Sequence, residues 1–346
     1  MNEITATRLA NHRLVGRQFK TPVAAVSWFG AVQAQEFAFA KWAISQRTGL
    51  TDARIEKAFN RGEILRTHVL RPTWHFVTPK DIRWMLALTG PRIRSAMSSY
   101  SRTLGIDAAQ ERKSRQVFER ALSGKFLMRT EIREELRRAR IDVAGTGRLP
   151  HFLMYAEISG LITSGPRIGS QFTYALLEER AAAVPVIERD EALGELAKRY
   201  FQSRRPATIQ DFVWWSGLIT ADARRAIEIA GVRMGDTAKA IGQPSSPSVH
   251  LLPIYDEYPL CYRDRSAAMS KHRASGRAGS IFVHLVVING LVEGFWTRAL
   301  SGNEAVITVQ PFRSLTRTEW AGVEREGQRH AAFLGMPVRI SRSLII

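Results

Sequence analysis

The feature that most constrains the fold of this chain lies within residues 108–178. There, three helical patterns are followed by a pair of strand-like runs. The apolar spacing predicts one helix through Arg115–Leu122, a second capped by Thr130, and a third over roughly 148–159. The segment 161–175 then has two strand-like runs around a Gly-Pro-Arg turn, which predicts a β-hairpin. Three helices and a hairpin in this order are typical of a winged helix. An unrelated helical bundle with a hairpin is the alternative.

The same order of elements recurs on both sides of this region. We therefore predict a mainly α fold with β-hairpins (α+β), made of three tandem winged-helix units and a C-terminal β-rich segment. The expected divisions are 1–107, 108–184, 185–260 and 261–346. The helical and strand-like patterns that support the flanking units are 23–30, 37–47, 52–60, 64–70 and 73–77 before it, and 192–201, 208–215, 221–230 and 249–254 after it.

The charge of the chain favours a polyanionic partner. Its 346 residues carry a formal net charge of +18, with a pI near 10.8. The excess is uneven, because residues 1–90 and 91–150 each carry +7 and residues 261–346 carry +6, whereas residues 151–260 carry −2. Basic regions on both sides of a neutral one suit contacts to phosphates on two sides of a groove. General solubility charge is the alternative explanation.

Several classes of protein lack support in the sequence. Cys261 is the single cysteine, so neither a disulfide framework nor a cysteine-based zinc site is expected. Phosphate-loop, dinucleotide and zinc-hydrolase motifs are absent from the sequence, and we expect neither cofactor nor metal. The N-terminus does not resemble a signal peptide, and no apolar stretch is long enough to span a bilayer. The expected location is cytoplasmic and nucleoid-associated.

Two short runs contain the residues best suited to chemistry. Gln33 and Gln35 flank an alanine, and Thr73 and His75 lie in a strand-like run, where alternation puts both on one face. Residues two apart on an α-helix point about 200° apart, so the glutamines must straddle a helix boundary to serve one site. Helix-surface polarity for the glutamines and core packing for His75 are the alternatives. Glu36 is the nearest carboxylate and an alternative to Gln35.

Three motifs resemble the AlkZ/YcaQ-like bacterial DNA glycosylases over nearly the whole chain. They are Gln33-Ala34-Gln35, Arg71-Pro72-Thr73-Trp74-His75, and residues 251–258 followed by Arg263-Asp264-Arg265. The resemblance implies three winged helices in a C shape and excision of bulky or cross-linked N7-alkylguanine during base excision repair. Glutamine at the third position of the first motif is similar to the AlkZ-type Gln-Φ-Gln branch.

The resemblance also implies roles for individual residues. Gln33, Gln35 and His75 would be catalytic, with Thr73 in support, and Arg71 and a basic hairpin loop with Lys271, Arg273 and Arg277 would contact DNA. An N7-alkylated purine is already cationic and leaves without an acid to protonate it, so glutamine oxygens facing the sugar cation suffice. The implied enzyme is a monomeric, monofunctional glycosylase acting on alkylated double-stranded DNA.

Two further alternatives follow from the same residues. A winged-helix DNA-binding or regulatory protein without catalysis would also account for the predicted units and the basic charge. The Asp256-Glu257 pair suggests acid–base chemistry, but we favour a structural role in which these acids pair with Arg263 or Arg265.

Overall fold

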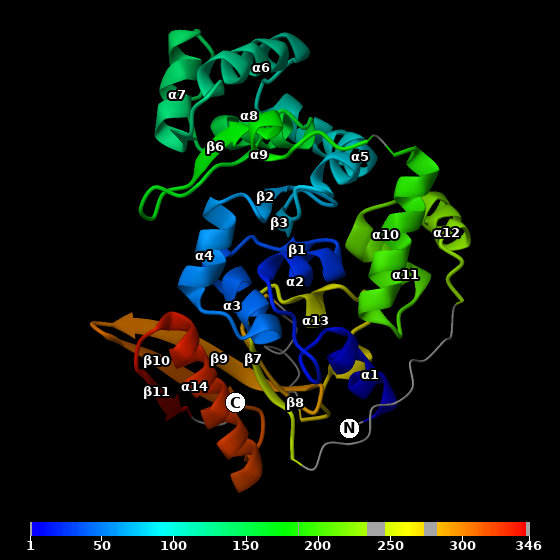
Figure 1. The fold of residues 1–346 in the computed structure, drawn as a ribbon, viewed down its shortest axis with the longest axis vertical. Coiled ribbons are helices and arrows are strands. Elements are labelled where there is room, and N and C mark those ends of the chain that lie inside the picture. Colours follow the sequence, from blue (N-terminus) through cyan, green and yellow to red (C-terminus); the bar gives the residue numbers. More distant parts are fainter. Residues whose placement is uncertain (1, 186, 234–245, 273–281, 344–346) are drawn as a thin grey trace.

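The computed structural model describes residues 2–185, 187–233, 246–272 and 282–343, and within them the fold is α+β, as predicted (Figure 1). The first part contains helices joined to a small antiparallel sheet of strand order β1-β3-β2. Threonines cap two of the helices, since the side chains of Thr21 and Thr51 accept hydrogen bonds from the main-chain N–H groups of Ala24 and Arg54. The elements are α1 (Glu3–Asn11), α2 (Pro22–Phe29), β1 (Val32–Gln33), α3 (Phe37–Thr48), α4 (Asp52–Asn60), β2 (Leu65–His68) and β3 (Trp74–Val77).

A long helix, α5 (Ile82–Thr103), leads to a second group of three helices and a three-stranded sheet of order β4-β6-β5. One predicted detail is wrong, because Thr130 does not cap its helix. The helix α7 starts one residue earlier, after Met128, whose main-chain N–H donates to Glu131 Oε2 at 2.6 Å. The elements are α6 (Ala108–Leu122), β4 (Leu127–Met128), α7 (Arg129–Arg138), α8 (Arg148–Ile158), β5 (Ile162–Ser164), β6 (Thr173–Leu176) and α9 (Leu177–Arg180).

The third group of helices does not have a hairpin of its own among the described residues. Its helices are α10 (Arg189–Arg204), α11 (Ile209–Ser216) and α12 (Thr220–Ile229), and Thr208 caps α11 as predicted. The strand expected to close this unit, β7 (Val249–Leu252), instead pairs antiparallel with β8 (Leu285–Ile288) at the edge of the C-terminal sheet. The physical reason is burial, since Val249 and Leu251 pack in one core with Val286 and Ile288.

The C-terminal region is a five-stranded sheet of order β11-β10-β9-β8-β7 with helices against it. Asn289 and Gly290 form the turn between β8 and β9, where both have positive φ, as the sequence predicts. The remaining elements are α13 (Glu257–Leu260), the short 3-10 helix η1 (Ser266–Ala268), β9 (Leu291–Ser301), β10 (Glu304–Pro311), α14 (Arg317–Leu334) and β11 (Val338–Arg342).

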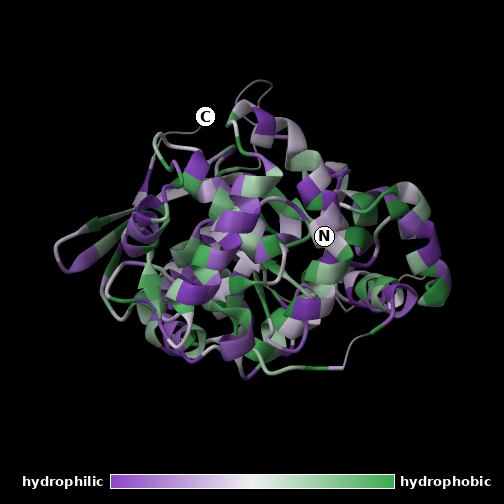
Figure 2. Ribbon diagram, turned by 90° about the horizontal axis from the view of Figure 1, so that it is seen from above, coloured by the Kyte–Doolittle hydropathy of each residue, from purple (hydrophilic) through white to green (hydrophobic). Residues whose placement is uncertain are grey.

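The hydrophobic cores cross the predicted divisions of the chain. One core combines residues 25–76 with residues 249–333, so the first sheet and the C-terminal sheet are packed together. A second core joins Leu65, Val77 and Met85 to Tyr200 and Trp215 of the third helical group. Hydrophilic and hydrophobic residues alternate along the outer helices (Figure 2). None of the described helices is long and apolar enough to cross a membrane. The two cores therefore pack distant segments of the chain against two sides of the sheet β1-β3-β2.

Candidate active site

A row of polar side chains crosses the first sheet at the glutamine motif. Gln33 on β1 lies directly opposite His75 on β3, and His75 lies opposite Thr67 on β2. Residues opposite each other in adjacent strands project to the same face, so the three side chains share one face of the sheet. All three are buried. The fold thus brings together the two predicted motifs, which are 40 residues apart in the chain.

Gln33 is held through its main chain and through its side chain. Its main-chain N–H donates to Glu257 Oε1 at 2.9 Å, and its side-chain Oε1 accepts from Arg71 Nη2 at 3.0 Å. The second oxygen of Glu257 accepts from Arg204 Nη2 at 2.6 Å and from Trp215 Nε1 at 3.2 Å. Both oxygens of this buried carboxylate are therefore occupied in holding the first sheet against α10 and α11.

Gln35 lies in the loop between β1 and α3, where it is partly exposed. Its Oε1 accepts from the main-chain N–H of Trp74 at 3.3 Å. The guanidinium of Arg66 donates to the carbonyl of Ala34 at 2.9 Å and to that of Gln35 at 3.4 Å, which fixes the loop. The prediction that the motif straddles a helix boundary is confirmed, because it occupies the strand and loop between α2 and α3.

The partners of the two glutamines determine the orientation of their carboxamides. Arg71 and the N–H of Trp74 can only donate, so each must face a carboxamide oxygen rather than a nitrogen. Each glutamine oxygen keeps a second lone pair for another donor. The carboxamide nitrogens of Gln33 and Gln35 donate no hydrogen bond to any part of the chain that the structure describes.

His75 is a neutral imidazole whose tautomer follows from its contacts. Its Nδ1 lies 2.9 Å from the carbonyl oxygen of Thr73, which can only accept, so Nδ1 carries the proton. Burial lowers the pKa of His75 well below its ordinary value of 6.5, and the nearby Arg71 cation lowers it further. The other nitrogen, Nε2, is buried and has no hydrogen-bond partner among the described residues. Nε2 is therefore a lone-pair acceptor on the same face as Gln33.

The remaining predicted site residues fall into two groups. Arg71 and Thr73 lie at the motif, and Arg71 Nε and Thr73 Oγ1 are buried without hydrogen-bond partners in the described part of the chain. Lys271 is exposed and distant in sequence from the motif, and the structure does not place it there. Arg273 and Arg277 lie outside the described residues. The side chain of Gln33 thus meets that of Arg71 and shares a face with His75, whereas Gln35 and Thr73 are joined to this region through main-chain groups. Thr73 lies just before β3, so the prediction that it shares a strand with His75 is wrong.

The predicted partners of Asp256 and Glu257 are wrong. Asp256 forms a bidentate ion pair with Arg47, with both N–O distances at 2.8 Å, and Glu257 pairs with Arg204 rather than with Arg263 or Arg265. Both pairs are buried and join α3 and α10 to the segment that starts α13. A buried acid attracts the cation that the fold brings to it, whatever the separation in sequence.

Sequence reasoning missed two residues that support the motif. Arg66 on β2 stacks over Trp74 at 4.3 Å, and burial lowers its pKa to about 10. Glu157 on α8 pairs closely with His68 Nδ1, and its other oxygen lies 3.5 Å from Trp74 Nε1. Arg66 could have been noticed in the sequence as an arginine within a strand-like run. Nothing in the local sequence relates Glu157 to residues more than 80 positions away.

Comparisons with known proteins relate the chain to one family and one fold. The family described as DNA glycosylase AlkZ-like matches residues 26–333. The chain is 24% identical over 345 residues to an interstrand DNA cross-link repair glycosylase from Streptomyces sahachiroi, covering 89% of this chain and 90% of that protein. It is similar in fold to the solved structure of the Streptomyces sahachiroi DNA glycosylase AlkZ, with a TM-score of 0.77, 23% identity and 98% of both chains covered.

Proposed function

The chain belongs to the AlkZ-like DNA glycosylase family, and we propose that it hydrolyses the N-glycosidic bond of bulky or cross-linked N7-alkylguanine in double-stranded DNA. It is a DNA glycosylase by family, which favours this activity over a regulatory protein without catalysis. A relative of similar length carries the name of an interstrand cross-link repair glycosylase, which supports the same class of substrate.

The observation that carries the proposal is that, among the described residues, no acid with a free oxygen forms a hydrogen bond to Gln33, Gln35 or His75. Gln33, Gln35 and His75 are neutral, and the carboxylate bonded to Gln33 has both oxygens engaged. Glu36 is exposed at the start of α3. A site without an acid cannot protonate a leaving base, so it suits a base that already carries a positive charge, as N7-alkylguanine does.

The proposed mechanism uses the lone pairs at the motif. As the bond to the cationic base breaks, positive charge grows on the sugar, and the free lone pairs of the glutamine oxygens stabilise it. His75 Nε2 accepts a hydrogen bond from the attacking water and orients it, because its pKa is too low for the ring to be cationic near neutral pH. Arg71 donates to Gln33 Oε1 and keeps it in place. The main-chain carbonyl of Thr73 accepts from Nδ1–H of His75 and so fixes the tautomer of this ring.

The decisive experiment is release of free base from a duplex that contains N7-methylguanine. The wild-type protein should release N7-methylguanine and leave alkali-labile sites, without added metal or cofactor. A matched duplex with unmodified guanine is the control, and it should remain intact. Tight binding to both duplexes with no release from either would favour the non-catalytic alternative and reject the proposal.

The proposal extends to partners and location. The partner is double-stranded, alkylated DNA, which the enzyme meets as a monomer in the base excision repair of alkylation damage. A DNA substrate of this kind places the enzyme in the cytoplasm, at the nucleoid. The basic segment with Lys271, Arg273 and Arg277 is proposed to contact the duplex beside the damaged base.

A further inference from the structure

The second group of helices does not offer DNA the two elements that a winged helix ordinarily uses. In helix-turn-helix proteins the recognition helix inserts into the major groove. Here the corresponding helix is α8, and every residue from His151 to Ile158 is buried. It packs against α5, α6 and β2, and its Glu157 reaches His68 and Trp74.

The hairpin of this unit is also occupied within the molecule. In the β5–β6 connection, the main-chain N–H of Arg167 donates to Asn60 Oδ1 at 2.8 Å, and its guanidinium pairs with Glu56 at 2.9 Å. Phe172 packs edge-on against Phe37, with 5.0 Å between ring centroids. The hairpin therefore docks on α3 and α4. The base of the hairpin is thus covered, and only its tip, residues 168–171, is exposed.

An arginine-lined hollow on α7 provides another exposed surface. Arg133 and Arg137 lie one helical turn apart, which places their Cβ atoms about 5–6 Å from each other. Together with Arg140 and the main chain of residues 141–145 they line a hollow of about 600 Å³. All three arginines are exposed. Figure 1 places α6 and α7 at the end of the molecule farthest from the C-terminal sheet.

The cations of this hollow are largely uncompensated. In the described part of the chain, Arg133 and Arg140 form no ion pair, and Arg137 has only an exposed contact at 3.9 Å with Glu134. Asp142, the one acid that lines the hollow, lies 3.4 Å from Arg148. Two unpaired arginines and a third with one long, exposed acid contact favour an anionic partner, and guanidinium groups suit phosphate oxygens.

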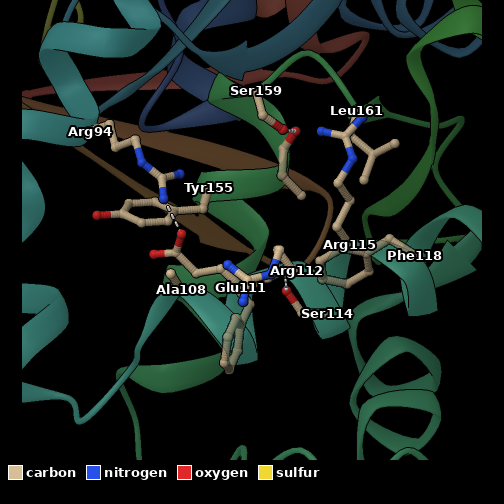
Figure 3. Close-up of a pocket in the computed structure, with 12 residues that line it drawn as sticks. Arg94, Ala108, Glu111, Arg112, Ser114, Arg115, Phe118, Tyr155, Ser159 and Leu161 are labelled. Carbon is tan, nitrogen blue, oxygen red and sulfur yellow. Dashed lines mark hydrogen bonds and ion pairs between the residues drawn. The ribbon is translucent and has the colours of Figure 1, made fainter.

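A second hollow of the same unit makes an informative contrast. It lies between α5, α6 and α8, has a volume of about 200 Å³, and is lined by Arg94, Arg112 and Arg115 (Figure 3). Arg94 pairs closely with Glu111, and Arg115 Nε lies 3.0 Å from Glu119 Oε1. Acids within the chain therefore neutralise two of these three cations, whereas Arg112 forms no ion pair among the described residues. The two hollows therefore differ in free charge.

We propose that the α7 hollow, lined by Arg133, Arg137 and Arg140, binds the phosphate backbone of the duplex that carries the damaged base. This inference rests on the proposed function for its partner, and it adds a second contact distant from the glutamine motif. The second unit thus acts as a backbone clamp, while its α8 packs against β2 and the base of its hairpin docks on α3 and α4. Such contacts add affinity without reading sequence.

The test compares two triple variants that remove equal charge from the same unit. Arg133→Ala/Arg137→Ala/Arg140→Ala should bind a 30-base-pair duplex about tenfold more weakly than wild type at about 100 mM salt. Its plot of log affinity against log salt should be shallower by about 2–3 units, because each lost phosphate contact removes ~0.9. The control, Arg94→Ala/Arg115→Ala/Arg138→Ala, removes three arginines that pair with Glu111, Glu119 and Glu135, and it should stay within about one unit of the wild-type slope.

Base release under single-turnover conditions with saturating enzyme separates this inference from the proposed function. The α7 variant should then match the wild-type rate, since it leaves Gln33, Gln35 and His75 unchanged. If wild type releases base and the α7 variant keeps the wild-type affinity and slope, the clamp is rejected while the glycosylase stands. An equal loss of duplex affinity in both triple variants also rejects the clamp, because it would show that total positive charge, and not this hollow, determines binding. If the α7 variant loses binding to polyglutamate while its duplex binding is unchanged, the partner of the hollow is an acidic protein and the proposal is overturned.

Discussion

At the scale of residues, Gln33 and Gln35 share one arrangement despite their different exposure. Each carboxamide oxygen accepts a hydrogen bond from the segment 71–74, from Arg71 in one case and from the main chain of Trp74 in the other. The second motif therefore orients the first. Neither glutamine has a charge, so their contribution to phosphate binding is small compared with their contribution to chemistry.

We predict that Gln35→Ala abolishes release of N7-methylguanine while duplex affinity stays within about threefold of wild type. Gln33→Ala should be impaired in the same way, because each variant loses the free lone pair of its own carboxamide oxygen. Single-turnover base release and equilibrium binding measure the two quantities separately. Wild-type release rates in both variants would remove the glutamines from the catalytic role.

Gln35→Asp should keep measurable activity, unlike Gln35→Ala. A carboxylate oxygen accepts hydrogen bonds as the amide oxygen does, and it stabilises a sugar cation better. Its negative charge beside phosphates costs about 1 kcal/mol of binding at a partly exposed position. The readout is the release rate on N7-methylguanine duplex. If the aspartate variant is as inert as the alanine variant, residue 35 is structural and His75 becomes the main residue holding the water.

At the scale of elements, two buried ion pairs fasten helices to the segment that begins α13. Arg47 of α3 pairs with Asp256, and Arg204 of α10 pairs with Glu257, which in turn holds the main chain of Gln33. The acids connect helices from different parts of the chain to the strand that carries the site. Removing one partner of such a pair leaves the other charge buried and unpaired.

Asp256→Ala should therefore destabilise the protein by about 3–5 kcal/mol, seen as a lower midpoint in urea unfolding. Asp256→Asn keeps an acceptor oxygen for Arg47 and should be destabilised less. Once folded, the Asn variant should release base at the wild-type rate, because Asp256 contacts Arg47 and the N–H of Tyr258 and none of the glutamines. A folded but inactive Asn variant would restore the acid–base interpretation of this pair.

At the scale of the whole molecule, basic charge dominates the interaction with DNA. With a net charge of +18, affinity for undamaged duplex should fall steeply between about 50 and 200 mM salt, as counterions are released from several phosphates. Filter binding or anisotropy at several salt concentrations gives the slope. Gln35→Ala is the matched control and should keep the same slope. A nearly flat dependence would remove DNA as the main partner.

Acid should destabilise the folded protein through its buried histidines. Burial lowers the pKa of His12 and His75 well below 6.5 and that of His250 to about 4. Below pH 6.5 the unfolded chain takes up protons at these rings and the folded chain does not, so stability falls as pH decreases. Each such ring contributes a slope of up to about 1.4 kcal/mol per pH unit.

Urea unfolding at a series of pH values checks this prediction. The free energy of unfolding should change little above pH 7 and fall between pH 6.5 and 4. A stability that rises as the pH falls through this window would show that the rings are protonated in the folded state.

Local sequence determined most helices and the position of the glutamine motif. Apolar periodicity predicted α2–α4, α6, α8 and α10–α12 to within a few residues at most ends, because this signal acts within a few residues of chain. The break between α2 and α3 followed from helix geometry alone, since residues two apart cannot share a helix face.

Tertiary structure alone decided which distant groups meet. Several contacts join segments that local spacing cannot relate, either because they lie in different predicted units or because they are far apart in the chain. They are the pairing of β7 with β8, the ion pairs of Asp256 and Glu257, and the contact of Glu157 with His68. The same burial that fixes these contacts keeps His75 neutral and occupies α8 and the second hairpin. Local patterns report which face of an element is apolar, and only the packed fold determines what covers that face and which charges it encloses.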